Sequence, residues 1–192
     1  MESIGTLGVV STVILALVVI IGIWAARLFN RLVKLKTLNE EGWSGILAAL
    51  KRRGDLIPNL VEVAAGYMTR ESETLTRIAQ ARGMVQAAHN VEEMAGAETS
   101  MMAALTGFKA TVENYPELKA DKNMMAIQEE LSTLEERIEK TRRYYNATVR
   151  DYNMEMARFP ANFVSGSMGF KPAALFETDE QSPATLSVKF NR

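Results

Sequence analysis

Apolar side chains between residues 124 and 159 recur with an alternating spacing of three and four positions. They are Met124, Ile127, Leu131, Leu134, Ile138, Tyr145, Tyr152 and Phe159, with Thr141 and Thr148 filling the two gaps. This spacing keeps one apolar seam on one side of an α-helix. Because a helix this long cannot bury its own seam, the pattern predicts a bundle in which neighbouring helices cover it.

Residues 4–26 carry no charge and are long enough to cross a bilayer. A signal peptide is the weaker interpretation, since no basic residue precedes the segment and no small-x-small cleavage site is followed by a polar mature start. Basic residues follow at Arg27, Arg31, Lys34 and Lys36. By the positive-inside rule, we expect a single-pass anchor with its N-terminus outside and the rest of the chain in the cytoplasm.

Gly8, Thr12 and Ala16 recur every four residues in this segment. Such a stripe lets two membrane helices approach closely, although small residues are common in membrane helices without that role. The three-four spacing of apolar residues continues beyond the membrane, from Leu28 to Leu50. We therefore expect a homo-oligomer, with coiled-coil packing along this seam. The alternative is that the long C-terminal helix of the same chain covers the seam, in which case the domain would be monomeric.

The spacing predicts that the first helix ends at Arg53, where three consecutive cations fit a last turn. Gly54 would be its left-handed cap. Asp55 would then cap a second helix, with Pro58 in its first turn.

Glu71 and Arg82 share the apolar face of that second helix. If this face is buried, each charge needs a partner. We expect them to pair with each other or with Arg142 or Arg143.

Prolines divide the remainder of the chain. Pro116 is expected to end a helix that contains Met101 to Tyr115, Asp121 to cap the long helix, and Pro160 to end it. After that the chain is irregular. Four apolar residues are expected to pack back on the bundle: Phe163, Phe170, Leu175 and Phe176.

These elements predict an all-α fold. An N-terminal transmembrane helix continues into a cytoplasmic antiparallel bundle of long helices, followed by an irregular C-terminal tail. The expected divisions are an anchor at 1–26, a bundle at 27–160 and a tail at 161–192 that packs partly on the bundle.

The long helix contains an internal repeat: RYYN at 143–146 returns as RDYN at 150–153. Seven residues make two helical turns, so like residues stack on one face. One interpretation is a recognition surface for a small ligand or peptide. The other is a polar layer that fixes the register of the bundle, as buried Asn does in coiled coils. The residues of this Arg-Tyr-Asn layer are Arg142, Arg143, Tyr145, Asn146, Tyr152 and Asn153.

The composition excludes several kinds of catalytic and binding site. The absence of Cys excludes disulfides and thiolate sites, and a single histidine removes most zinc sites and catalytic triads. Lys plus Arg (22) nearly balances Asp plus Glu (23), so no basic excess points to nucleic acid. With no phosphate-binding loop or EF-hand spacing, we expect no enzyme, no cofactor and no metal.

Several short motifs occur in order along the chain. They are LKRR at 50–53, DLIPNLV at 55–61, AR at 81–82, YPELKA at 115–120, RR at 142–143, YN at 145–146 and 152–153, FP at 159–160, GF at 169–170 and FE at 176–177. In these motifs the chain resembles the LemA family of bacterial membrane-anchored helical proteins. It departs from the family pattern at Arg70, where His is frequent, and at Ala49, where Gln is usual.

The resemblance implies a cytoplasmic helical domain on one helix of the bacterial inner membrane, and it does not imply a catalytic mechanism. It also implies envelope proteins or membrane proteases as partners, besides the lipid bilayer. We expect a non-enzymatic, membrane-anchored scaffold or interaction protein of the bacterial envelope. The alternative is a sensor or adaptor that binds a small ligand or peptide at the Arg-Tyr-Asn layer. A concave pocket at this layer would favour the sensor, and a flush packed layer the scaffold.

Overall fold

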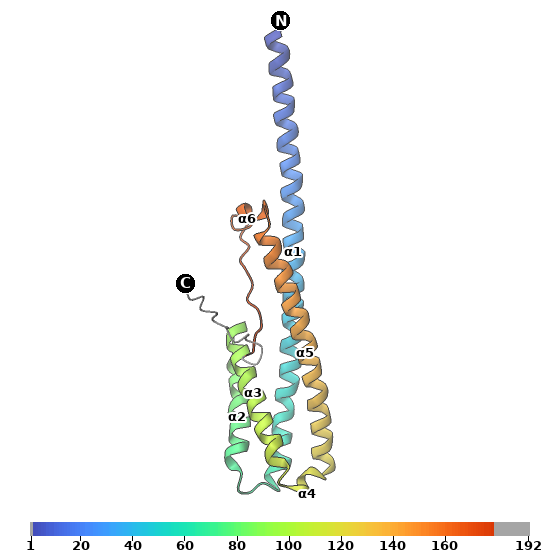
Figure 1. The fold of residues 1–192 in the computed structure, drawn as a ribbon, viewed down its shortest axis with the longest axis vertical. Helices are drawn as coiled ribbons and strands as arrows, with labels where there is room; N and C mark the ends of the chain where they lie inside the picture. The colour runs from blue at the N-terminus through green and yellow to red at the C-terminus, as the bar shows by residue number, and fades with distance from the viewer. Residues whose placement is uncertain (1, 179–192) are drawn as a thin grey trace, which may run out of the picture. The chain divides into compact units, whose positions relative to one another are not determined.

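The computed structural model describes the backbone of residues 2–178 and the side chains of residues 11–178. Residues 2–178 form α-helices and connecting segments without a β-strand, which confirms the predicted all-α class. The helices are α1 (Glu2–Ala65), α2 (Ser72–Ala87), α3 (Val91–Val112), α4 (Pro116–Lys119), α5 (Lys122–Ala157) and α6 (Ala161–Val164) (Figure 1).

The chain forms two compact units, each of which combines segments that are distant in the sequence. Unit 1 consists of the residues up to Glu40 together with Thr148–Ala173. Unit 2 consists of Glu41–Ala147 and the residues from Ala174 onward. Helices α1 and α5 therefore each contribute to both units. The predicted boundaries of an anchor, a bundle and a tail stay a prediction.

Helix α1 continues through the position where the sequence predicts its end. The prediction that Gly54 caps this helix and that Asp55 begins another is wrong, because Pro58 lies inside α1. Among the described residues, positive φ occurs at Gly169 and not at Gly54. Burial explains the difference: Ile57, Leu60 and Ala64, all on the turns around and after Pro58, are at most 1% exposed. Burying these side chains offsets the roughly 3 kcal/mol that a proline costs a helix.

Arg82 replaces the backbone hydrogen bond that Pro58 cannot make. In an α-helix the N–H of residue 58 would bond to the carbonyl of residue 54, but proline has no N–H. The Arg82 Nε–H instead donates to the carbonyl oxygen of Gly54 at 2.9 Å. Helix α2 thus supplies the donor that α1 lacks.

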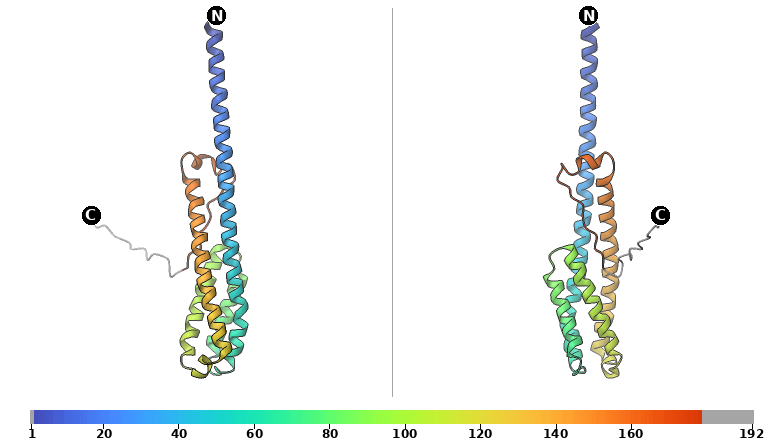
Figure 2. Two further views of the ribbon diagram at one scale, coloured as in Figure 1. Left: turned by 90° about the vertical axis from the view of Figure 1, so that its right-hand side faces the viewer. Right: turned by 60° about the vertical axis from the view of Figure 1, so that its left-hand side comes forward.

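All the helical segments of unit 2 contribute to one core. The buried residues of that core are Ile57, Leu60 and Ala64 of α1, Met68 of the connection, Ile78 and Ala81 of α2, Met101, Phe108 and Val112 of α3, Leu118 of α4 and Met124 of α5. Helices α2 and α3 run side by side in opposite directions (Figures 1 and 2).

Two helix starts in unit 2 are fixed by side-chain caps. The Asn90 side chain accepts from the Glu93 N–H at 2.8 Å, so α3 begins at Val91, before the stretch from Met101 for which the sequence predicts a helix. The Asp121 carboxylate accepts from the N–H groups of Asn123 at 2.8 Å and Met124 at 3.0 Å, which confirms the predicted cap of α5. The bond from the Met124 N–H, more than any other contact, lowers the pKa of Asp121.

Unit 1 packs α6 and the following turn against α1 and the end of α5. Its core contains Leu28, Leu32, Tyr152, Met156, Ala161 and Phe170, and Trp24, Leu35, Val164, Met168 and Ala173 pack against these residues. The rings of Phe29 and Phe170 lie 5.5 Å apart. The prediction that apolar residues after Pro160 pack back holds for Phe170 and for Phe176, which is buried in unit 2. It is wrong for Phe163, which is 74% exposed.

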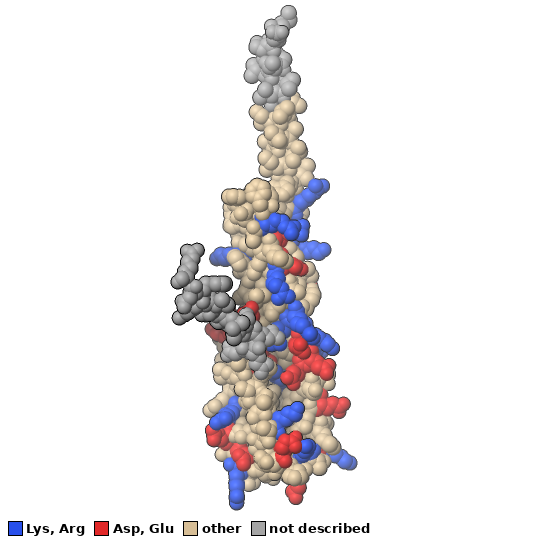
Figure 3. Space-filling view, viewed as in Figure 1, with Lys and Arg blue, Asp and Glu red and all other residues tan. Residues whose placement is uncertain are grey.

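From Ser11 to Ile23 the side chains of α1 are largely apolar and exposed. Its most apolar window has a mean hydropathy of 2.4 and is 6% buried, and among the described helices α1 is the one that is long and apolar enough to span a membrane. Figure 3 shows this stretch without blue or red atoms. Thr12 and Ala16 are exposed, whereas Gly8 lies outside the residues with described side chains. An exposed apolar helix of this kind is compatible with a membrane anchor.

Candidate functional site

The polar side chains of the seven-residue repeat hold the chain's own C-terminal segment. In unit 2 the Asn146 amide donates to the Phe176 carbonyl at 3.0 Å and accepts from the Phe176 N–H at 2.8 Å. The Tyr145 hydroxyl donates to the Ala174 carbonyl at 2.8 Å. Residues 174–178 have no secondary structure, so these side chains satisfy backbone groups that a helix or sheet would otherwise satisfy.

The second copy of the repeat makes the same contacts in unit 1. The Asn153 amide donates to the Ala173 carbonyl at 2.9 Å and accepts from the Ala173 N–H at 3.0 Å. The Tyr152 hydroxyl donates to the Lys171 carbonyl at 3.0 Å. The backbone partners of the second copy therefore lie three residues before those of the first.

Chain geometry explains why seven residues of helix match three residues of the segment. Seven helical residues rise about 10.5 Å. Three extended residues span about 10 Å. A seven-residue repeat on α5 therefore presents one tyrosine and one asparagine for every three residues of an extended chain that runs in the opposite direction.

Aromatic packing closes the layer in unit 2. The Trp43 ring lies 5.6 Å from that of Tyr145 and 5.8 Å from that of Phe176. Gly42 allows this approach, because a Cβ at that position would lie 3.2 Å from the Tyr145 Cα. Tyr145 is 4% exposed and Phe176 is 0% exposed. Burial, with a smaller contribution from Glu92, raises the pKa of Tyr145.

The two arginines next to the repeat have different environments. Arg142 is buried and donates from Nη1 to the Thr178 hydroxyl at 2.9 Å. Arg143 is exposed and pairs with Glu139 of the preceding turn at 3.4 Å. Arg142 is therefore part of the layer, and Arg143 belongs to the surface of α5.

Glu71 and Arg82 do not pair as the sequence predicts. Glu71 accepts from the Tyr115 hydroxyl at 3.2 Å, and Arg82 bonds to the Gly54 carbonyl. Both side chains are half-buried, so neither needs an ionic partner as a buried charge would. Burial and the neighbouring Glu71 raise the pKa of Tyr115.

The buried ion pair of unit 2 joins Arg53 and Glu98 instead. Arg53 is 3% exposed and Glu98 is 2% exposed. The guanidinium donates from Nη1 to Oε1 at 2.9 Å, and its Nη2 bonds to Oε2. The sequence interpretation of Arg53 as a cation at a helix end missed this role, because the partner is 45 residues away.

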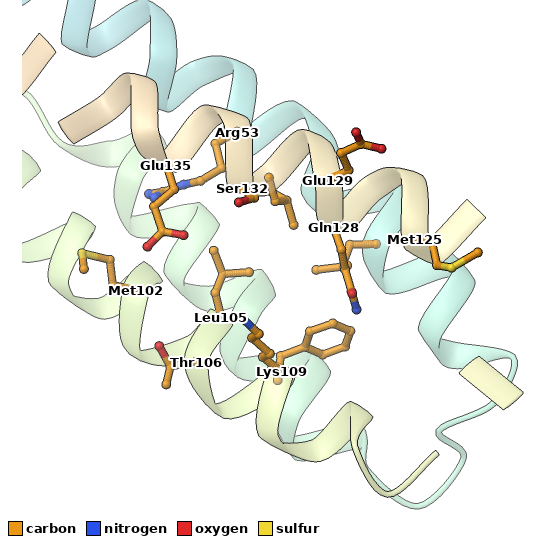
Figure 4. A pocket seen from close by; sticks show the side chains of 13 residues that line it. Arg53, Met102, Leu105, Thr106, Lys109, Met125, Gln128, Glu129, Ser132 and Glu135 are labelled. Atoms are coloured by element: carbon orange, nitrogen blue, oxygen red, sulfur yellow. The ribbon is translucent and has the colours of Figure 1, made fainter. Parts of the chain in front are cut away.

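A groove of about 590 Å³ lies between α3 and the first half of α5 in unit 2. Its apolar lining consists of Leu60, Met102, Leu105, Phe108, Met125 and Leu131. Figure 4 shows Met102 and Thr106 of α3 opposite Ser132 and Glu135 of α5, with Arg53 reaching toward the groove from α1.

The groove combines an apolar floor with polar rims. Thr106 and Lys109 line the α3 side, and Gln128, Glu129, Ser132 and Glu135 line the α5 side. Within the part of the chain that the structure describes, no group of three or more His, Asp and Glu side chains converges as a metal site would require. The groove therefore offers apolar contacts at its floor and polar contacts at its rims.

The LemA family model matches residues 42–190 of the chain. The match includes the Trp43 contact, both copies of the repeat, the groove and the segment that the repeat holds. The chain belongs to the LemA family.

One relative that carries the family's name agrees with this membership, and two others match a shorter stretch. Protein LemA of Metamycoplasma hominis is 26% identical over 155 residues, which cover 79% of this chain and 69% of that protein. The magnetosome proteins MamQ 1 and MamQ 2 of Paramagnetospirillum magneticum are each 33% identical over 82 residues. That alignment covers 43% of this LemA-family chain and 30% of each magnetosome protein.

In this LemA-family chain, the sequence pattern predicts the Arg-Tyr-Asn layer but not the C-terminal segment that its side chains bind. The sequence does contain a signal for this bound segment: GF at 169–170 and FE at 176–177 place large apolar residues in an otherwise irregular stretch. Gly42 and Trp43 had no such signal, because in the helical pattern they look like a weak stretch of the seam. The groove could not be predicted, since it depends on the spacing between two helices.

Proposed function

We propose that this LemA-family chain is a membrane-anchored, non-enzymatic scaffold of the bacterial envelope that binds partner proteins through unit 2. The observation that supports a scaffold over a sensor is the filled Arg-Tyr-Asn layer. In unit 2 the side chains of Arg142, Tyr145 and Asn146 bond to residues 174–178 of the same chain. In unit 1 those of Tyr152 and Asn153 bond to Lys171 and Ala173. A layer whose side chains bond to the chain's own backbone is the packed arrangement that supports a scaffold.

The open groove between α3 and α5 is the proposed partner site. Its position between two helices, its apolar floor and its polar rims suit the apolar face of an amphipathic helix. Met102 and Met125 are flexible and can adapt to different side chains. Glu129 and Glu135 on the α5 rim favour a partner helix that carries Lys or Arg along one edge.

The proposed setting is the inner membrane of a bacterial cell, crossed once by α1 with the N-terminus outside. The basic residues that follow the apolar segment support this orientation. Envelope proteins, including membrane proteases, are the partners we propose. Protease added to intact spheroplasts should leave the chain beyond Arg27 uncut, and digestion there would contradict the topology.

Self-association through Gly8, Thr12 and Ala16 remains part of the proposal. The stripe allows close helix contact, and confinement to one membrane raises the effective concentration of the copies. Replacement of Gly8 and Ala16 by Ile should reduce the oligomer mass in mild detergent. A single-copy mass for the unmodified chain would contradict self-association.

A substitution that blocks the groove tests whether partner proteins bind there. Thr106→Arg places a long charged side chain at the exposed rim of the groove, and Thr76→Arg makes the same change on the exposed face of α2. Proteins crosslinked to the full chain in native membranes should be lost with Thr106→Arg and retained with Thr76→Arg. Equal recovery with both variants would contradict a partner site in the groove.

A further inference from the structure

Two large aromatic side chains of unit 1 are exposed side by side. Phe159 is 76% exposed and Phe163 is 74% exposed. Their rings meet edge to face with centroids 6.0 Å apart. Exposed apolar groups that gather in this way commonly mark a contact surface.

The packing of unit 1 places these rings at the level where the apolar segment of α1 ends. Trp24 packs against the cluster that contains Leu28, Ala161 and Phe170. Arg27, the first charged residue after the apolar segment, lies in the same stretch of α1. Figures 1 and 2 show α6 beside α1, which continues alone from there toward the N-terminus. If α1 spans a bilayer, the turn from Phe159 to Phe163 lies at the membrane surface.

The charges around this turn suit a lipid headgroup layer. Arg27, Arg158 and Lys171 are exposed in unit 1. The neighbouring Glu155 is 8% exposed and is paired with Arg31 at 3.0 Å and with Arg158 at 3.7 Å. Blue atoms flank the apolar stretch of α1 where it joins the packed part of unit 1 (Figure 3). The surface beside the rings is therefore apolar and basic.

We propose that the turn from Phe159 to Phe163 docks on the bilayer as a second membrane contact. Both rings enter the headgroup region, and Arg27, Arg158 and Lys171 face anionic headgroups. A spanning helix alone leaves the unit free to turn about the helix axis, whereas a second contact at the surface fixes its orientation. This inference rests on the proposed membrane anchor.

Spin labels measure the contact in the full chain. Because the sequence contains no cysteine, Asn162→Cys places a single label on the exposed face of α6 between the two rings. Val18→Cys labels the apolar segment, and Lys34→Cys labels an exposed position of α1 beyond it. The chain is reconstituted in vesicles of phosphatidylcholine and phosphatidylglycerol. Collisions with oxygen, which enters lipid, are compared with collisions with a water-soluble nickel chelate.

The label at residue 162 should show lipid contact between the values at residues 18 and 34. Phe159→Ser with Phe163→Ser should shift it to the value at residue 34, and circular dichroism should show unchanged helix content because both rings are exposed. Water-like collisions at residue 162 in the unmodified chain, or protection from both reagents by another protein copy, would overturn the inference. Lipid contact at residue 18 in the same sample shows that the anchor stands, whereas its loss there would overturn the anchor itself.

Discussion

At the scale of single residues, two charged side chains that no local pattern distinguishes make the buried ion pair of unit 2. Arg53 and Glu98 are withdrawn from water, and two hydrogen bonds join them. A buried pair of this kind adds little net stability compared with apolar residues, but losing one partner leaves an uncompensated charge.

We therefore expect Glu98→Ala to lower the free energy of unfolding by about 3–5 kcal/mol. Arg53→Met combined with Glu98→Leu should cost much less, because both charges leave together. The matched control is Arg52→Ala, which removes an exposed pair with Glu130 and should cost at most about 1 kcal/mol. Urea titrations of the three variants measure this. Equal losses for Glu98→Ala and Arg52→Ala would contradict a buried pair.

Asn146 acts as both donor and acceptor toward a single backbone residue. Asn146→Asp retains the acceptor but sets a second acceptor against the Phe176 carbonyl, so we expect a loss of about 1–3 kcal/mol. The released segment should be cleaved faster in limited proteolysis. Asn114→Asp, at an exposed position of unit 2, is the control. Unchanged stability and cleavage with Asn146→Asp would instead favour the sensor interpretation.

At the scale of helices, the proline of α1 and the arginine of α2 form a pair that only the structure reveals. Arg82→Met leaves the Gly54 carbonyl without its donor and should cost about 1–2 kcal/mol. In a Pro58→Ala background the new N–H can bond that carbonyl, so the same Arg82 substitution should cost less. Thermal unfolding of the four chains of this double-mutant cycle gives the coupling. Additive effects would show that the bond from Arg82 does not compensate for the N–H that Pro58 lacks.

The cap of α5 predicts an acid-dependent term in stability. The pKa of Asp121 is lowered from its ordinary value of 3.8, chiefly by the Met124 N–H. A lowered pKa gives stability that is present above the unfolded-state value and is lost as the pH falls through the folded-state value. Asn also caps helices but does not titrate in this range, so Asp121→Asn should remove this term. Unfolding midpoints below pH 4 that change in parallel for both proteins would contradict it.

The sequence predicted helices where the pattern was long and regular, and failed where local signals opposed distant contacts. Helix α5 followed from the spacing of three and four, and its cap followed from the preference of helix starts for residues such as Asp121. The predicted break after Arg53 relied on three cations, a glycine and a proline, and burial of Ile57, Leu60 and Ala64 outweighed those signals. The Arg-Tyr-Asn layer was visible as a repeat, but its function depends on an extended segment that has no periodic pattern.

At the scale of the whole molecule, the described features separate into three surfaces. An apolar helix is compatible with a membrane, the repeat on α5 binds the chain's own segment, and a groove with polar rims is left open by the part of the chain that the structure describes. The proposed scaffold assigns partner proteins to the groove, because residues 11–178 do not fill that site.

Photo-crosslinking in intact cells tests this assignment most directly. A benzophenone amino acid is placed at Met102 on the α3 wall, at Met125 on the α5 wall, and at Arg77, which is exposed on α2. The account predicts adducts with the same partner protein from both walls of the groove and no such adduct from position 77. Adducts that contain only a second copy of this chain, or equal labelling from all three positions, would contradict it.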